Sequence, residues 1–368
     1  MFYNVYGDRT VVVTGHTGFK GSWLTAWLLK LGARVVGISN GVPTSPSHFE
    51  CADLGAHVAD LRIDIRDAKA LASAIAKAAP DFVFHLAAQP LVRHSYNEPI
   101  ETLAVNIMGS AHLLDSLRKL GKPCAVVMVT SDKCYDNVEW DWGYRETDRL
   151  GGKDPYSASK GAAELVIRTF VESYFGNGNA IRVAVGRAGN VVGGGDWAAE
   201  RLVPDCVRAW AQKQPVEIRS PHATRPWQHV LEPLSGYLTL GAELKKRADL
   251  HGEPFNFGPP AEQNHSVLEL LTEMKRHWPQ ATHIVAPNNE KPEAGLLKLN
   301  CDKALALLGW RATLDFVETV QMTGEWYRTF YEHPGARMLD VTNAQIDEYT
   351  AAARRRELRW LQESTASA

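Results

Sequence analysis

Short apolar runs alternate with segments of helical periodicity through the first half of the chain. The runs are continuous, without the in-and-out alternation of strands that face water on one side. Continuous apolar strands separated by helices are typical of a parallel sheet covered on both faces. Because crossover connections are right-handed, the pattern predicts an α/β fold with a Rossmann-type doubly wound sheet. The expected strands are 10–14, 34–38, 58–63, 81–86, 125–129 and 180–185, and the expected helices are 19–31, 68–79, 100–120 and 156–174.

A glycine loop follows the first expected strand directly. Glycines let the backbone approach a ligand closely, and a helix N-terminus carries partial positive charge and unpaired N–H groups. The spacing GxxGxxG differs from the general GxGxxG pattern, and glycines after a strand also form ordinary turns. The position after a first strand in a βα alternation favours a pyrophosphate site. The residues expected to bind a dinucleotide here are Gly15, Thr17, Gly18, Phe19, Lys20 and Gly21.

The end of the second expected strand leaves the choice between NAD and NADP open. An acidic residue about 20 residues beyond the glycines usually binds the ribose 2′-hydroxyl of NAD. Ser39 and Asn40 stand there instead, with no arginine to favour a 2′-phosphate, and either side chain could bond a ribose hydroxyl. Asp64, after the third strand, is placed to reach an adenine amine, although a surface acid is an equally good explanation.

A serine, a tyrosine and a lysine form the expected catalytic set. Tyr156 and Lys160 are i and i+4, so they share one face of a helix, where the ammonium is expected to lower the phenol pKa from about 10. Ser131, after the run 125–129, is placed to bond a substrate alcohol. The same spacing occurs on many amphipathic helices, and the glycine loop is what favours a nicotinamide site. Asp132 and Lys133 add two ionisable groups, so we expect oxidation to be one step of a longer reaction.

The regular alternation loosens beyond about residue 190, where glycine and proline divide the chain into short segments. A length of 368 residues accommodates two domains that share a cleft. We expect a dinucleotide-binding domain over 1–189 and a smaller, mainly substrate-binding α/β domain over 190–335. Residues 336–368 are expected to form a helical tail. Its charges indicate a solvated helix rather than a nucleic-acid site, with 363–368 frayed.

The composition excludes several classes of protein. Hydrophobic residues make up 45% of the chain and charged residues 22%, as in soluble globular proteins. A net charge of −2 without a basic face argues against nucleic acid as a partner. The apolar runs are strand-sized, which argues against a membrane span, and no signal peptide is evident. Scattered cysteines without CxxC, and histidines without ligand spacing, indicate a reducing cytoplasm and no metal site.

Five motifs stand out: residues 14–23 (TGHTGFKGSW), 86–93 (LAAQPLVR), 130–135 (TSDKCY), 187–197 (RAGNVVGGGDW) and 225–230 (RPWQHV). Taken together they resemble the extended short-chain dehydrogenase/reductases, in the branch that acts on nucleotide sugars. Within that branch they are most similar to the CDP-glucose 4,6-dehydratases, and the likeness runs from about residue 5 to 330. It implies NAD as the cofactor and CDP-D-glucose as the substrate; the residues alone do not identify the cytidine base.

The resemblance implies a hydro-lyase with internal redox. Tyr156 takes the 4-hydroxyl proton while hydride leaves C4, and the new 4-ketone acidifies the proton at C5. A base removes that proton, an acid assists departure of water from C6, and hydride returns to C6, giving CDP-4-dehydro-6-deoxy-D-glucose for surface polysaccharide such as O-antigen. Asp132 is the expected acid. Lys133 is the expected base as a neutral amine, or else binds a hydroxyl while Asp132 performs both proton transfers.

The resemblance also assigns binding residues and an assembly. A guanidinium matches phosphate geometry, so Arg201 and Arg225 are candidates to bind the substrate diphosphate. The alternative is that each forms a structural ion pair. The long helices 100–120 and 156–174 imply a homodimer or homotetramer. The implied cofactor residues are Asp64, Ile65, Leu86, Ala87 and Ala88, with Tyr156 and Lys160, and the implied substrate residues are Gln89, Arg93, Asn190, Arg201 and Arg225.

Two other activities are compatible with such a fold. One is another nucleotide-sugar 4,6-dehydratase or a 4-epimerase; an epimerase needs no acid and base beside Ser131, so Asp132 and Lys133 argue against it. The more distant alternative is a non-catalytic NAD-sensing protein. Such a protein is expected to lack Tyr156 or Lys160, and both are present.

Overall fold

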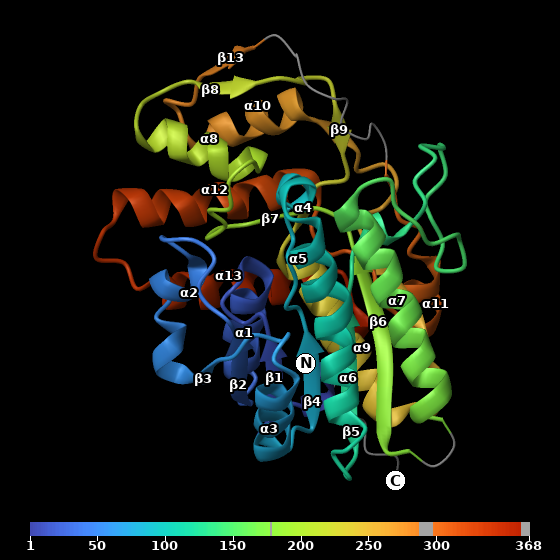
Figure 1. The fold of residues 1–368 in the computed structure, drawn as a ribbon. Helices are drawn as coiled ribbons and strands as arrows, with labels where there is room; N and C mark the ends of the chain where they lie inside the picture. Colours follow the sequence, from blue (N-terminus) through green and yellow to red (C-terminus); the bar gives the residue numbers. More distant parts are fainter. Residues whose placement is uncertain (177–178, 287–296, 362–368) are drawn as a thin grey trace.

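A parallel sheet of seven strands forms the centre of the part of the chain that the computed structural model describes, residues 1–176, 179–286 and 297–361 (Figure 1). The strand order is β11-β6-β5-β4-β1-β2-β3, and each neighbouring pair is parallel. The predicted fold class is therefore confirmed. The strands are β1 Thr10–Thr14, β2 Arg34–Ser39, β3 Ala59–Arg62, β4 Phe82–His85, β5 Cys124–Val129, β6 Ile181–Ala188 and β11 Pro254–Phe257.

Helices cover both faces of the sheet, because successive side chains of a strand point to opposite sides. In β1, Val11 and Val13 pack into one hydrophobic core and Val12 packs into the other. The first core is completed by α1 (Phe19–Lys30), α9 (Leu231–Lys246) and α13 (Met338–Arg355), and the second by α3 (Ala68–Ala78), α6 (Gly109–Leu117) and α7 (Pro155–Tyr174). The expected strands and helices of the first half thus form with ends shifted by a few residues, except that the helix expected over 100–120 is interrupted.

The helix expected over 100–120 is built of three pieces. α5 (Pro99–Leu103) runs into a π-helical segment, Ala104–Met108, and then into α6, which ends at Leu117 instead of residue 120. A π-bulge inserts an extra residue into a helical turn and is frequent at functional sites. Here it contains the buried side chain of Asn106. Side-chain periodicity over so short a stretch does not separate α from π hydrogen bonding, so the interruption was not predicted.

A second layer of short elements lies over the carboxyl ends of the strands (Figure 1). α9 and β11 nevertheless return from beyond residue 190 to the main sheet, where β11 pairs with β6. Residue 189 is therefore not a boundary of the sheet. The predicted division there between a dinucleotide-binding part and a substrate-binding part remains a prediction. The elements of this layer are β7 Val191–Val192, α8 Leu202–Ala211, β8 Val216–Ile218, β9 Thr224–Arg225, β10 Gln228–His229, β12 His265–Ser266, α10 Val267–His277, β13 His283–Val285 and α12 Phe316–Glu332.

The C-terminal helix is not the solvated helix that its charges predicted. α13 contacts α1, and Tyr349 of α13 is fully buried. Beyond the helix, Trp360 stacks on Phe2 with ring centroids 5.0 Å apart, so the two ends of the described chain share one core. The prediction of a solvated helix rested on the arginines at 354–356, and it overlooked the apolar residues on the opposite face of the helix. The expectation of a frayed end at 363–368 lies outside the described residues.

The remaining elements are short, and they are η1 Phe2–Asn4, α2 His48–Cys51, η2 Leu54–His57, α4 Val92–Asn97, η4 Asp132–Cys134, η5 Ala248–Leu250, α11 Asp302–Leu308 and η6 Arg359–Leu361. Within the described ranges, no helix has the length and apolar character needed to cross a membrane.

Candidate active site

The glycine loop joins β1 to α1 in a turn that leaves no room for side chains. Gly15 has a φ of +74°, and a Cβ there would lie 2.7 Å from the backbone nitrogen of Ala87. A Cβ on Gly21 would lie 2.0 Å from the carbonyl oxygen of Gly15. Gly18 is the N-cap of α1, and its N–H donates to Gly15 at 3.0 Å. The loop therefore brings a helix N-terminus against bare backbone, which fits the pyrophosphate of a dinucleotide.

The other predicted loop residues fix this turn in place. The hydroxyl of Thr17 donates to the carbonyl of Gly41 at 2.6 Å, which ties the loop to the segment after β2. Phe19 packs against the first core. Leu86, which follows β4, donates its N–H to the carbonyl of Thr14 at 3.0 Å, and Ala87 donates to the Thr14 hydroxyl at 3.3 Å. The predicted cofactor residues at the ends of β1 and β4 thus share one backbone surface.

The side chain of His16, from the glycine loop, packs against the end of β2, where the sequence has no acidic residue. Ser39 bonds Nδ1 of His16 at 3.0 Å, so one of the two proposed ribose contacts is already engaged within the protein. Nε2 of His16 lies 3.0 Å from the carboxylate of Asp60 on β3. Burial lowers the pKa of His16, although Asp60 opposes the effect. An acid is thus present beside this strand, but it comes from the neighbouring strand and binds His16 and Arg62.

The segment after β3 carries two predicted cofactor residues, of which Asp64 was expected to reach the adenine amine. Asp64 is bound by Arg66, with Nη2 2.7 Å from its carboxylate, and this contact is the main cause of its lowered pKa. Ile65 is buried, and its side chain fills the space beside Gly109. Asp64 thus has an ion-pair partner in Arg66, as expected of an ordinary surface acid. Its contact with adenine remains a prediction.

Ser131, Tyr156 and Lys160 meet beyond the carboxyl end of β5. Tyr156 and Lys160 are 8% and 7% exposed, and the lysine nitrogen lies 5.9 Å from the centre of the tyrosine ring. Ser131 forms a side-chain hydrogen bond to Tyr156 that lowers the phenol pKa. Asp154 caps α7 by accepting from the N–H of Ser157 at 2.9 Å, which fixes where the helix begins. The set has the geometry needed to move a proton from an alcohol.

The ionisation of Tyr156 differs from the sequence expectation. Burial raises the pKa of Tyr156 to about 12, and the hydrogen bond with Ser131 only partly opposes this. Burial also lowers the pKa of Lys160 to about 8. The predicted lowering of the Tyr156 pKa by Lys160 is therefore wrong for the protein alone. Desolvation of the phenolate outweighs an ammonium that is itself desolvated.

Asp132 and Lys133 occupy η4 directly after Ser131. The hydroxyl of Ser131 donates to Oδ1 of Asp132 at 2.8 Å and accepts the N–H of Lys133 at 3.3 Å. Asp132 is buried, whereas Lys133 is partly exposed. The serine hydroxyl is thus hydrogen-bonded to the carboxylate of Asp132 and to the backbone of Lys133. The two ionisable residues that the sequence added to the expected catalytic set thus lie next to Ser131, and their roles as acid and base remain predictions.

Two cations from distant segments face these residues. Burial lowers the pKa of Lys20 to about 8, and its charge interacts with Asp132, Arg201 and Lys160. Arg201 forms an ion pair with Asp196 at 2.8 Å, which is the structural alternative noted from the sequence. It also interacts electrostatically with Tyr156. Lys20, which was expected to bind only the dinucleotide, therefore belongs to the catalytic surroundings as well.

The other predicted substrate residues are less uniformly placed. Gln89 uses its side chain to hold its own turn, with Nε2 2.9 Å from Thr102 and Oε1 2.5 Å from the N–H of Leu91. Nη1 of Arg93 lies 3.1 Å from Glu200, the residue before Arg201. The side chain of Gln89 is thus engaged within its own turn, and its expected contact with the substrate remains a prediction. Asn190 is exposed between β6 and β7, and Arg225 lies on β9 with Nη1 2.8 Å from the carbonyl of Thr224.

Sequence reasoning missed a buried polar chain behind the catalytic set. Asn106, in the π-helical segment, donates to the hydroxyl of Ser159 at 2.8 Å, next to Lys160. It also accepts the N–H of Gln89 at 2.8 Å. His85 at the end of β4 bonds the hydroxyls of Thr14 at 2.7 Å and Ser110 at 3.1 Å. The sequence did contain a sign of this chain, because Asn106 and His85 are polar residues in otherwise apolar segments. Buried polar groups are nearly always hydrogen-bonded, so such residues indicate paired partners nearby.

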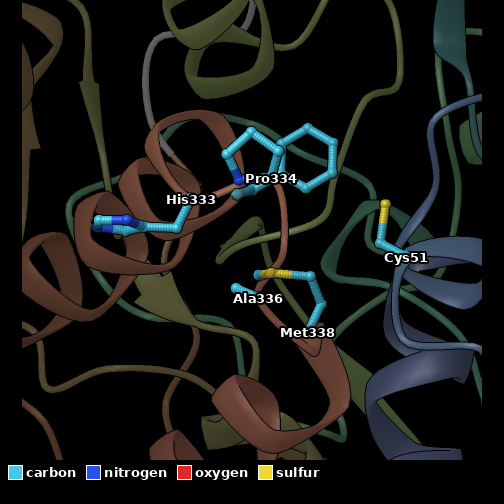
Figure 2. A pocket seen from close by; sticks show the side chains of 6 residues that line it. Cys51, His333, Pro334, Ala336 and Met338 are labelled. Carbon is cyan, nitrogen blue, oxygen red and sulfur yellow. The ribbon is translucent and has the colours of Figure 1, made fainter.

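A cavity lies apart from all of these residues. Its volume is about 290 Å³, and it lies between α2 and the link from α12 to α13 (Figure 2). No predicted site residue lines it. Among the described residues, no group of histidine, cysteine and acidic side chains could hold a metal ion. The lining residues are Cys51, Phe330, His333, Pro334, Ala336 and Met338.

The fold and the catalytic set define an enzyme of the short-chain dehydrogenase/reductase type. Residues 12–323 match the family model described as GDP-mannose 4,6 dehydratase. The chain is 45% identical to the CDP-glucose 4,6-dehydratase of Salmonella typhimurium strain LT2, over 96% of this chain and 99% of that protein. The chain therefore belongs to the GDP-mannose 4,6 dehydratase family of sugar-nucleotide enzymes. The resemblance inferred from the motifs is confirmed.

More distant relatives share the fold. The dTDP-glucose 4,6-dehydratase of Streptomyces antibioticus is 27% identical over 86% of this chain and 92% of its own. Among solved structures, an epimerase of Methanothermobacter thermautotrophicus superposes with a TM-score of 0.77 at 25% identity, covering 90% of this chain and 95% of that one. The UDP-glucose 4-epimerase of Thermotoga maritima superposes with a TM-score of 0.75 at 23% identity, covering 87% and 99%.

Proposed function

We propose that this enzyme converts CDP-D-glucose to CDP-4-dehydro-6-deoxy-D-glucose, a step in deoxysugar biosynthesis, with NAD as its cofactor. The observation that carries the proposal is that Asp132 and Lys133 stand in η4 directly after Ser131, with the Asp132 carboxylate hydrogen-bonded to the serine hydroxyl. Its support is the 45% identity, over nearly the whole chain, to a protein described as a CDP-glucose 4,6-dehydratase. An epimerase would leave Asp132 and Lys133 without a role.

NAD would be held at the N-terminus of α1, by the loop Gly15–Gly21 and the segment Leu86–Ala88. Bound NAD supplies a hydride acceptor for C4 and a hydride donor for C6. A positive charge on the bound nicotinamide would counter the burial that raises the pKa of Tyr156. Ser131 then donates to the sugar oxygen while Tyr156 takes the 4-hydroxyl proton.

Elimination of water requires an acid near C6 and a base near C5. Asp132 is buried and bonded to Ser131, and we assign it the acid role. Lys133 is assigned the base role, which needs a neutral amine. Binding of the substrate diphosphate is proposed for Arg201 and Arg225, with Asn190 and Arg93 at the same edge.

The test is incubation of the purified protein and NAD with the CDP-, dTDP-, UDP- and GDP-hexoses, followed by mass detection of water loss. Water loss from CDP-glucose alone is the expected result. Water loss from another nucleotide sugar alone would preserve the mechanism and change the substrate. Conversion without a change in mass would indicate an epimerase and overturn the proposal.

We also propose that the enzyme is a homodimer or homotetramer. Large apolar side chains are exposed along α5 to α6 and along α7, which contact each other. Exposed patches of this kind mark interaction surfaces. The residues are Ile100, Met108, Leu165 and Tyr174, at 76%, 49%, 55% and 51% exposure. A cytoplasmic location and a product destined for surface polysaccharide are further parts of the proposal, which rest on the resemblance.

A further inference from the structure

A cavity of about 10 Å³ lies beside Asp132, between the catalytic turn and the layer above the sheet. This volume suffices for about one water molecule and excludes a sugar ring. Two polar side chains line it, Asp132 and Gln228. The rest of its wall is apolar and includes Leu297 and Leu299.

Gln228 carries a polar atom that has no hydrogen-bond partner among the described residues. The side chain is 1% exposed on β10, and its Nε2 donates to the carbonyl of Phe257 at 3.3 Å. Within the described ranges, its Oε1 is buried and accepts no hydrogen bond. Buried acceptors in folded proteins are nearly always bonded, so this oxygen is available to a hydrogen-bond donor that enters the cavity. The cavity volume restricts such a donor to about the size of a water molecule.

Asp132 presents its second oxygen to the same space. Oδ1 is bonded by the hydroxyl of Ser131, and Oδ2 faces Gly189, where an added Cβ would lie only 3.1 Å away. Gly189 also lines the cavity. A molecule in the cavity therefore has a carboxyl group on one side and the Gln228 oxygen as an acceptor on the other.

We propose that this cavity receives the oxygen that leaves C6, and that Gln228 Oε1 accepts a hydrogen bond from it. The inference rests on the proposed dehydratase function. In the elimination, the C5–H electron pair becomes the C5=C6 bond, and the C6–O bond breaks with its pair on oxygen. The proton of Asp132 joins that oxygen to form water. The water then donates to Gln228 and to the Asp132 carboxylate.

The apolar wall strengthens this arrangement. Hydrogen bonds are stronger where the surroundings have a low dielectric constant. Because the hydroxyl gains its second proton only as it leaves, the bond to Gln228 is stronger after departure than before. Such an interaction accelerates the step, whereas one made equally with the bound substrate does not.

The test compares CDP-glucose with CDP-6-deoxy-6-fluoroglucose in the wild type and in Gln228→Met. Fluoride leaves without becoming water and has no hydrogen for Gln228 to accept. With CDP-glucose, the variant is expected to lose about tenfold in the rate of water loss, the effect of one ordinary hydrogen bond. Reduced cofactor should accumulate, because oxidation at C4 precedes the slowed step. With the fluoro substrate, the rate of fluoride release should fall by less than about twofold.

Gln345→Met is the matched control. Gln345 is also buried, donates Nε2 to a carbonyl, and has an Oε1 without a partner within the described part of the chain, but it lies on α13. The Gln345→Met variant should lower stability about as much as Gln228→Met does. It should leave the ratio of the rate of water loss to the rate of fluoride release unchanged. Gln228→Glu keeps an acceptor oxygen, so it should retain the wild-type ratio, and it replaces Gln228→Met if that variant does not fold.

Equal losses on both substrates in Gln228→Met would overturn the inference, as would an altered ratio in Gln228→Glu. Wild-type protein that eliminates neither water nor fluoride from these substrates would instead refute the proposed function itself. The two failures are therefore distinguishable in one set of assays.

Discussion

Glu164 and Arg187 form a buried ion pair through two parallel contacts, 2.7 Å from Nε to Oε1 and 2.6 Å from Nη2 to Oε2. Glu164 lies one helical turn beyond Lys160 on α7, and Arg187 lies on β6. The hydroxyl of Thr130, next to Ser131, donates to the same carboxylate at 2.5 Å. The pair thus connects the two segments that carry the catalytic serine and the catalytic tyrosine and lysine.

Glu164→Gln should therefore weaken both folding and catalysis. Removal of one partner leaves the Arg187 charge uncompensated in the interior, and the expected loss in the free energy of unfolding is about 3 kcal/mol. Since Ser131 and Lys160 lose a shared support, kcat should fall about tenfold or more, with a smaller change in KM. Denaturant unfolding and steady-state kinetics measure these effects. Glu172→Gln, in an exposed ion pair with Arg168 on the same helix, is the control and should change stability by less than about 0.5 kcal/mol. An unchanged kcat in Glu164→Gln would exclude a positioning role.

Tyr156→Phe should abolish turnover and preserve cofactor binding. The variant lacks the group that takes the 4-hydroxyl proton but keeps the ring that packs near Lys160. A loss of at least about a thousandfold in water loss is expected for removal of an acid–base group. Mass detection of product and calorimetric titration with NAD give the two readouts. Tyr174→Phe, at an exposed position on the same helix, serves as the control. Full activity in Tyr156→Phe would refute the proposed proton transfer.

Lys133→Met should slow removal of the C5 proton specifically. If Lys133 is the base, incorporation of solvent deuterium at C5 should fall about a hundredfold, while C4 oxidation continues to reduce the cofactor. Proton NMR of the product in deuterated water and the absorbance of reduced nicotinamide separate the two steps. Lys153→Met, an exposed lysine before α7, is the matched control. Unchanged deuterium incorporation would assign both proton transfers to Asp132, the alternative already present in the sequence.

Glu232 should make stability depend on pH. Burial raises the pKa of Glu232 from 4.5 to about 7, although its carboxylate accepts from the N–H groups of Thr313 and Leu314 and from Tyr349. The folded state therefore binds a proton that the unfolded state releases at lower pH. Its contribution is complete below pH about 4.5 and is lost as the pH rises to about 7, a difference of ~3 kcal/mol. Glu232→Gln removes this titration.

Thermal unfolding of the wild type and of Glu232→Gln across pH 5 to 8 measures the effect. The variant should be less stable at low pH, because an amide has one acceptor where the carboxyl group has two. The difference in stability between the proteins should shrink as the pH rises. A constant difference across this range would show that Glu232 has the same protonation in the folded and unfolded states.

Leu165→Asp should reduce the size of the assembly in solution. The substitution places a charge on the exposed apolar face of α7, where a second copy of the chain is proposed to pack. Light scattering coupled to size exclusion should show a monomer, and dimer or tetramer for the wild type. Leu305→Asp, on an equally exposed leucine of α11, should leave the assembly unchanged. A wild-type monomer would refute the proposed oligomer directly.

The sequence predicted the elements of the first half because buried parallel strands and amphipathic helices leave periodic apolar patterns. The same local logic predicted the glycine loop, since a positive φ at Gly15 and the close approach at Gly21 both require glycine. Tyr156 and Lys160 were predicted to lie together because four residues make about one helical turn. Each of these inferences depends on residues close in the chain.

Relationships between distant segments followed no local pattern. The sequence by itself determined which side chains could perform the chemistry, including Ser131, Asp132 and Tyr156. Only the tertiary structure decided that burial raises the pKa of Tyr156, that the side chain of Gln89 bonds within its own turn, and that Gln228 and Asp132 line one cavity. The physical reason is that desolvation and the pairing of buried polar groups depend on every segment packed around a side chain, and those segments come from all parts of the chain.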